Sequence, residues 1–117
     1  AKPEVTAFPI LDYFGITERF EVRAGATLTS DRRNKAQVID HALHQLGIHA
    51  DPDLYDHVIM VGDRDHDVHG AYHHGIACIG VTWGYGSPAE LLSAGAVALA
   101  ESPAEVAELV CRAYARP

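Results

Sequence analysis

Two carboxylates follow an apolar run of the chain at a spacing suited to binding a metal ion. The run Val58–Val61 predicts a buried strand, which ends at Gly62. Asp63 comes next, and Asp67 follows four residues later, so both carboxylates are expected at the mouth of a sheet. Such hard oxygen ligands suit Mg²⁺, which usually takes one or two protein carboxylates and shares its other positions with water and phosphate. The alternative is that Asp63 only caps the next helix, because Asp is a favoured N-cap residue.

A lysine at the junction of a polar loop and a helix is the second candidate for chemistry. Lys35 follows the polar stretch 29–34 and opens a helical pattern that extends to Leu46. In this place an ammonium group can pair with a phosphate as a compact point charge, assisted by the backbone N–H groups of the helix start. A solvated surface lysine is the competing interpretation, because lysine is rarely buried unless it is paired.

Glycine marks the predicted helix ends, and serine with proline marks two helix starts. Four helical patterns stop at a glycine followed by an apolar or small residue, which is the left-handed stop that satisfies the last carbonyls of a helix. These glycines are Gly15, Gly47, Gly75 and Gly95. The sequence Ser-Pro-Ala-Glu occurs at 87–90 and at 102–105, and combines an N-cap serine, a proline at the first helical position and a glutamate that closes a capping box. It predicts helices over 88–94 and 103–115.

Four short apolar runs lie between the helices and predict buried strands. They are Phe20–Ala24, His57–Val61, Cys78–Thr82 and Ala96–Ala100. Alternating helices and strands imply a parallel sheet with right-handed crossovers and helices on both faces. The predicted fold class is therefore α/β, a Rossmann-like three-layer α/β/α arrangement with a mostly parallel sheet. Ligands of such folds bind at the carboxyl ends of the strands.

Length, charge and hydropathy limit the functions open to the chain. At 117 residues it is long enough for one domain and too short for two, so residues 1–117 are expected to belong to a single domain. A net charge of −7 argues against nucleic acid as a partner, because a nucleic-acid surface needs a basic face. The apolar runs are far shorter than the roughly 20 residues of a membrane helix, and no signal-peptide pattern opens the chain. We therefore expect a cytoplasmic protein with no membrane partner.

Together these motifs resemble the haloacid-dehalogenase (HAD) superfamily of hydrolases, in its phosphoglycolate-phosphatase-like and 5'-nucleotidase-like branch. The resemblance extends over nearly the whole chain. Its motifs are Lys2-Pro3-Glu4 with the helix end Phe14-Gly15-Ile16, Lys35-Ala36-x-Val38-Ile39, Val61-Gly62-Asp63-Arg64-x-His66-Asp67-Val68-x-Gly70-Ala71 and Ile79-Gly80-Val81-Thr82-Trp83-Gly84-Tyr85-Gly86-Ser87. The Gly-Asp-Arg and Gly-Tyr-Gly-Ser parts are the most specific.

The resemblance implies a Mg²⁺-dependent phosphatase and a role for each matching residue. Lys35 would bind the phosphoryl oxygens, Asp63 would be a Mg²⁺ ligand, and Asp67 would support the metal as a second carboxylate, behind the direct ligands or through water. Lys2 matches the family's lysine that follows a phosphate-binding Thr, Ser or Asn. That phosphate-binding residue would lie before Ala1. The substrate would be a small phosphorylated metabolite such as phosphoglycolate or a nucleoside monophosphate. An aspartate of the intact protein would attack it to form an aspartyl-phosphate, which water hydrolyses.

The resemblance also predicts that part of the enzyme lies outside these residues. The family's Asp-x-Asp segment supplies the nucleophile and the general acid, and it has no match here, since Asp51-Pro52-Asp53 has only the spacing. The cap domain that selects substrate has no match either. We therefore expect residues 1–117 to be the C-terminal part of a HAD-like core domain, inactive alone, with the missing N-terminal half as a partner. Because the family's nucleophile strand lies in the middle of the sheet, its absence should leave two facing strand edges unpaired.

Three other interpretations stay open. The same fold could transfer phosphate to another acceptor, including a protein side chain, because acceptor choice would depend on the cap. A non-catalytic receiver-like or interaction module has a similar sheet and an Asp/Lys pair around phosphate, although its lysine lies near the fifth strand and Lys35 precedes the apolar run 58–61. Finally, His66, His69 and His73 would share one helix face and suggest a transition-metal site.

Overall fold

The computed structural model describes residues 2–29 and 31–113, and the chain divides into two compact units, Ala1–Pro52 and Asp53–Pro117. The last two residues of the helix predicted over 103–115 lie outside the described residues. No helix within the described ranges is both long enough and apolar enough to span a bilayer.

The first unit contains two α-helices, α1 (Glu4–Tyr13) and α2 (Lys35–Gln45), and a short 3-10 helix, η1 (Thr17–Arg19). A reciprocal cap starts α2. Asn34 Oδ1 accepts a hydrogen bond from the Gln37 backbone N at 2.8 Å, and Gln37 Oε1 accepts one from the Asn34 backbone N at 3.1 Å. The predicted helix start at Lys35 is confirmed, and this cap explains it.

The strand predicted over Phe20–Ala24 is wrong. The segment is irregular, and the chain forms only an isolated parallel bridge between Pro3 and Ala26 just beyond it. Arg23 is directed to α1, where its guanidinium carbon lies 4.3 Å from the centre of the Phe8 ring. An apolar run becomes a strand only where a neighbouring strand takes up its N–H and C=O groups, and the described part of the first unit offers none.

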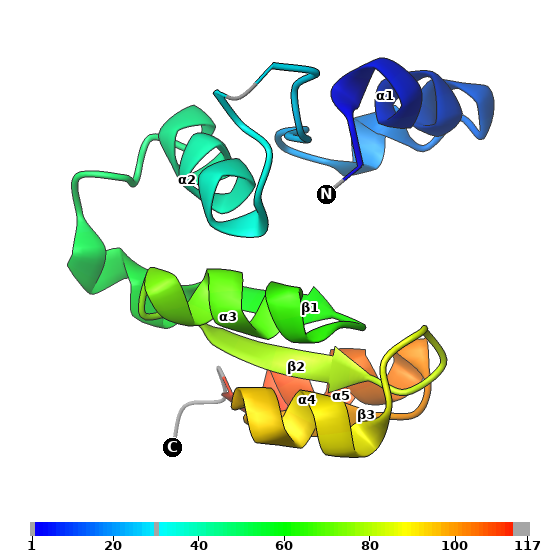
Figure 1. Ribbon diagram of the computed structural model, residues 1–117, viewed down its shortest axis with the longest axis vertical. Helices are drawn as coiled ribbons and strands as arrows, with labels where there is room; N and C mark the ends of the chain where they lie inside the picture. Colours follow the sequence, from blue (N-terminus) through cyan, green and yellow to red (C-terminus); the bar gives the residue numbers. More distant parts are fainter. Residues whose placement is uncertain (1, 30, 114–117) are drawn as a thin grey trace. The chain divides into compact units, whose positions relative to one another are not determined.

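The second unit carries a three-stranded parallel sheet in the order β1-β2-β3 (Figure 1). The strands are β1 (Ile59–Gly62), β2 (Ala77–Val81) and β3 (Ala98–Ala100). The register sets Gly62 beside Gly80 and Ile79 beside Ala98. Three of the four predicted strands are therefore confirmed, together with the α/β class and the parallel direction of the sheet.

Helices cover both faces of this sheet. The 3-10 helix η2 (Pro52–His57) precedes β1, and the α-helices are α3 (Asp65–His73), α4 (Pro88–Ala94) and α5 (Pro103–Ala113). Helices α3 and α4 contact each other and share one face, where Leu91 of α4 lies over Gly80. The preceding residue, Ile79, lines a cavity with Leu109 of α5, so α5 covers the opposite face, behind β2 in Figure 1.

The four predicted glycine stops are confirmed. All four glycines have a positive φ, between 66° and 111°. Gly95 has the largest value and is the C-cap of α4, where its N–H bonds the carbonyls of Leu91 and Leu92. A residue with a Cβ is strained in this conformation, so the glycine determines where the helix ends.

β1 lies at one edge of the sheet and, within the described residues, pairs only with β2. Its Val61 side chain is 41% exposed, unlike the buried apolar residues of β2. An apolar edge strand of this kind is open to pairing with another strand. One of the two unpaired edges expected from the missing strand is thus present. Within the described residues of the first unit no strand forms, so the second edge is not seen there.

Leu91 provides a test of this packing. It is 0% exposed, whereas its neighbour Leu92 is 55% exposed. We expect Leu91→Ala to lower the free energy of unfolding by about 2–5 kcal/mol, because it removes buried methyl groups and leaves a cavity over Gly80. Urea denaturation of the full-length protein measures the change. Leu92→Ala is the matched control and should change the free energy by less than about 0.5 kcal/mol. Equal effects of the two variants would contradict the packing of α4 on the sheet.

Candidate functional site

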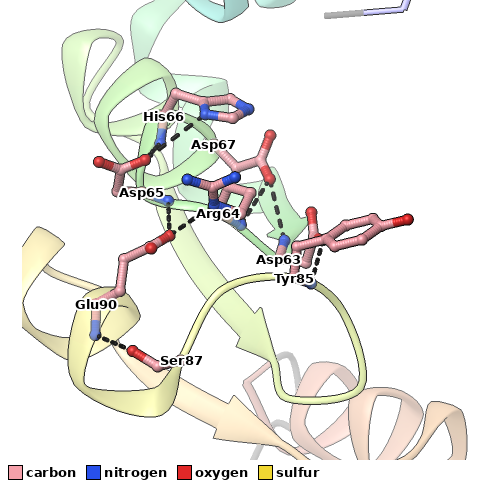
Figure 2. Close-up of polar contacts among 8 residues, drawn as sticks. All are labelled: Asp63, Arg64, Asp65, His66, Asp67, Tyr85, Ser87 and Glu90. Carbon is pink, nitrogen blue, oxygen red and sulfur yellow. Dashed lines mark hydrogen bonds and ion pairs between the residues drawn. The ribbon is translucent and has the colours of Figure 1, made fainter.

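A buried carboxylate holds the loop between β1 and α3. Asp67 is 4% exposed, and its Oδ2 accepts hydrogen bonds from the backbone N of Asp63 at 3.0 Å and of Arg64 at 3.1 Å (Figure 2). The Arg64 group belongs to the N-cap of α3, where backbone N–H groups have no helical carbonyl as a partner. Gly62 is required beneath this carboxylate, because a Cβ there would overlap Asp67. Asp67 therefore caps α3, and the interpretation that Asp63 caps it is wrong.

The carboxylate of Asp63 lies against the loop that follows β2. Its Oδ2 accepts a hydrogen bond from the Tyr85 backbone N at 2.9 Å, and its backbone carbonyl accepts one from the Gly86 N at 2.9 Å. A Cβ on Gly84 would overlap the Asp63 side chain, so glycine allows this close approach. Within the described part of the chain, Oδ1 of Asp63 has no hydrogen-bond partner, and it is available to a ligand.

A second acidic side chain joins α4 to the same loop. Glu90 Oε2 accepts hydrogen bonds from Arg64 Nε at 2.9 Å and from the Asp65 backbone N at 3.0 Å. The hydrogen bond and the negative charge of Glu90 raise the pKa of the Arg64 guanidinium above its ordinary value. Ser87 Oγ accepts from the Glu90 N at 3.0 Å, so the N-cap predicted at Ser87 is confirmed. The prediction that the Glu90 side chain closes this capping box is wrong, because its carboxylate reaches across to Arg64.

The lysines predicted to bind phosphate both lie in the first unit. Lys35 is the first residue of α2 and is half-buried, whereas Lys2 is exposed and accepts a hydrogen bond at its backbone carbonyl from the Ala26 N at 2.9 Å. The structure brings Asp63 and Asp67 together. Lys2 and Lys35 belong to the other unit, and their approach to these carboxylates stays a prediction.

The available donor atoms fit a hard divalent cation. Four carboxylates surround a single cationic side chain, that of Arg64, so the site has an excess of negative charge. The carboxylates belong to Asp63, Asp65, Asp67 and Glu90. Carboxylate oxygen is the ligand that Mg²⁺ prefers, and Oδ1 of Asp63 is such a ligand. Residues 2–29 and 31–113 contain no group of three His, Cys, Asp or Glu side chains that could hold a metal, and this includes the histidines of α3. Asp63 would therefore share a metal with ligands from water, from substrate or from further protein residues.

A parallel sheet covered by helices, with carboxylates at the carboxyl end of β1, defines a Rossmann-like α/β protein, a fold class whose ligands bind at the strand ends. A family model described as HAD-hydrolase-like matches residues 32–113. The chain belongs to the HAD-hydrolase-like family, as its motifs predicted.

Proteins similar to this chain include a tyrosine-protein kinase, a 5'-nucleotidase and a predicted phosphatase. It is 49% identical over 86 residues to the tyrosine-protein kinase PtkA of Mycobacterium tuberculosis, covering 74% of this chain and 28% of PtkA. It is 40% identical over 91 residues to a 5'-nucleotidase of Pseudomonas aeruginosa, covering 78% of this chain and 39% of that protein. The crystal structure of a predicted phosphatase from Clostridium acetobutylicum superimposes with a TM-score of 0.81 at 37% identity, covering 95% of this chain and 48% of that one. The chain thus spans less than half the length of each of these relatives.

The buried position of Asp67 leads to a prediction about stability. We expect Asp67→Ala to lower the free energy of unfolding by about 1–3 kcal/mol, because it leaves the N–H groups of Asp63 and Arg64 without their acceptor. Asp67→Asn should cost less, since its amide oxygen can still accept. Urea denaturation of the full-length protein measures both changes. The exposed Asp56 lies in the same unit, and Asp56→Ala is the control. A loss for Asp67→Ala no larger than for Asp56→Ala would contradict the capping role.

Proposed function

We propose that the full-length protein containing this chain is a Mg²⁺-dependent phosphate-monoester hydrolase that acts through an aspartyl-phosphate. The proposal rests on the hydrogen bonding of the Asp63 carboxylate at the carboxyl end of β1. One oxygen is held by the Tyr85 N–H, while the other has no partner within the described residues. A small phosphorylated metabolite, such as phosphoglycolate or a nucleoside monophosphate, is the proposed class of substrate. Family membership and the relation to a 5'-nucleotidase support this class.

The residues around Asp63 suit the binding of Mg²⁺. Asp63 Oδ1 would be a direct ligand, and Asp67 would keep the backbone of Asp63 in place through its hydrogen bond to that residue's N–H. When bound, Mg²⁺ supplies positive charge that stabilises the phosphoryl oxygens during transfer. The hydrogen bond from the Tyr85 N–H to Oδ2 fixes the Asp63 carboxylate. The other oxygen, Oδ1, is therefore already ordered when the cation binds.

Lys35 is proposed to bind the phosphoryl group. As the first residue of α2 it combines an ammonium charge with the backbone N–H groups of a helix start, and both attract anions. Lys2 is proposed to contact the same phosphate. It precedes Pro3 and Glu4, and Glu4 is fixed by an ion pair with Arg32 at 2.8 Å, which holds the start of α1 to the segment around Gly25.

The remaining parts of the mechanism are assigned to residues outside this chain. Because these relatives are about two to three times as long, we propose that a further segment supplies the aspartate nucleophile, the general acid and the cap that selects substrate. The apolar edge of β1 is suited to pair with a strand of that segment. Residues 1–117 alone are expected to be inactive for this reason.

Replacement of Asp63 is the direct test of the proposed hydrolase. In the full-length protein, Asp63→Asn should lower Mg²⁺-dependent hydrolysis of p-nitrophenyl phosphate by about 100-fold or more, because it removes the charge that holds the cation. Asp53→Asn changes an exposed aspartate of the same unit and should leave the rate within about twofold. A wild-type protein whose phosphatase activity is absent, or indifferent to Mg²⁺, would refute the proposed function.

Lys35 can be tested in the same assay. Lys35→Met should lower kcat/KM by about 100-fold through loss of the charge on the phosphoryl oxygens, with an unchanged concentration of Mg²⁺ at half-maximal rate. Arg19→Met removes an exposed cation from the same unit and should have no effect. If Lys35→Met and Arg19→Met gave the same kcat/KM, Lys35 would be a surface lysine without a role in phosphate binding.

Phosphotransfer to a protein is a second candidate function, favoured by the 49% identity to a tyrosine-protein kinase. The same aspartyl-phosphate would then give its phosphoryl group to a tyrosine hydroxyl instead of to water. Incubation of the full-length protein with ATP and Mg²⁺, followed by mass spectrometry for phosphotyrosine, separates the two. Release of inorganic phosphate from monoesters without phosphotyrosine supports the hydrolase. Phosphotyrosine formation that is lost in Asp63→Asn supports the transferase.

A further inference from the structure

Glu90 lies one turn into α4, and its carboxylate bonds a different part of the chain. Oε2 accepts from Arg64 Nε at 2.9 Å and from the Asp65 backbone N at 3.0 Å, so one oxygen holds two consecutive residues where the β1–α3 loop enters α3 (Figure 2). These residues directly follow Asp63. The position of Glu90 is itself fixed, because its backbone N donates to Ser87 Oγ at 3.0 Å.

These bonds close a ring around Asp63. On one side, the Asp63 carbonyl accepts from the Gly86 N, and Gly86 leads directly into the Ser87 cap of α4. On the other side, Glu90 returns from α4 to the residues after Asp63. Gly86 is buried between the two, and a Cβ there would lie 2.8 Å from Glu90 Oε2 and would overlap the Asp63 carbonyl. The Gly86 backbone therefore lies close to both the Asp63 carbonyl and the Glu90 carboxylate, so the ring is closely packed.

The exposure of the ion pair indicates what it contributes. The side chains of Arg64 and Glu90 are 42% and 30% exposed, so solvent screens their attraction and the pair adds little to global stability. A pair of the same N–O distance, 2.9 Å, joins Arg112 to Glu108 on the surface of α5. The difference is location, since only the Arg64–Glu90 pair is part of the ring around Asp63.

We propose that Glu90 is a positioning residue, which holds the β1–α3 loop so that the Asp63 carboxylate is preorganised for a divalent cation. This inference rests on the proposed metal-dependent function. A ligand held within a fraction of an ångström binds its metal without a cost of ordering, and loss of such support typically lowers metal affinity by about 10–100-fold. Glu90 acts through the backbone of the loop and does not contact the metal.

The test measures Mg²⁺ binding to the full-length protein by isothermal titration calorimetry, in the absence of substrate. Glu90→Gln should raise the Kd for Mg²⁺ by about tenfold or more, because the neutral amide holds Arg64 and the Asp65 N–H more weakly. Arg64→Gln removes only one of the two bonds and should raise the Kd less. The double variant should resemble Glu90→Gln alone, because both residues act in one unit. With saturating Mg²⁺, KM for p-nitrophenyl phosphate should be unchanged.

Glu108→Gln is the matched control, since it disrupts the equivalent pair on α5, and its Kd should stay within about twofold of the wild type. A Glu90→Gln protein with a lower melting temperature and the wild-type Kd would show a structural role only and would overturn the proposal. If the wild type binds Mg²⁺ but hydrolyses no monoester, the hydrolase fails while the Kd comparison still decides the role of Glu90. If the wild type does not bind Mg²⁺, both proposals fall.

Discussion

The hydrogen bonds from the Asp63 and Arg64 backbones to the buried Asp67 carboxylate are the interaction on which the rest of the site depends. A carboxylate in a protein interior is stable only where donors replace its water, and the start of a helix supplies such donors together with a favourable dipole. The loop after β1 must therefore bend over Asp67. Gly62 permits that bend, because no side chain fits between the strand end and the carboxylate.

With the loop fixed in this way, neighbouring segments can tie to it from outside. The turn after β2 gives the N–H groups of Tyr85 and Gly86 to Asp63, and α4 gives the carboxylate of Glu90 to Arg64 and Asp65. Backbone segments approach here so closely that Gly84 and Gly86 have no room for a Cβ. The glycines of the Gly-Tyr-Gly-Ser motif thus have a packing role, because they let the turn after β2 lie against Asp63 at the end of β1.

The two units of the chain contain different parts of the proposed phosphatase site. The second unit contains the sheet and the carboxylates, and the first unit contains both lysines. An apolar edge strand, β1, borders the carboxylates, and the relatives in the HAD-hydrolase-like family are longer than this chain. In the proposed phosphatase, a strand of a further segment added beside β1 would bring the nucleophile next to Asp63.

The sequence by itself determined the features that depend on a few neighbouring residues. Four features were predictable in this way: the glycine stops, the serine N-cap of α4, the strands of the second unit and the proximity of Asp63 to Asp67. Caps and turns in particular are set within about four residues. Only the tertiary structure decided three others. Phe20–Ala24 lacks a strand to pair with, Asp67 rather than Asp63 caps α3, and Glu90 reaches Arg64 instead of its own helix start. The first and third depend on partners far along the chain, which the local sequence does not contain. The second depends on which of two nearby carboxylates reaches the helix start, and residue types alone do not show this.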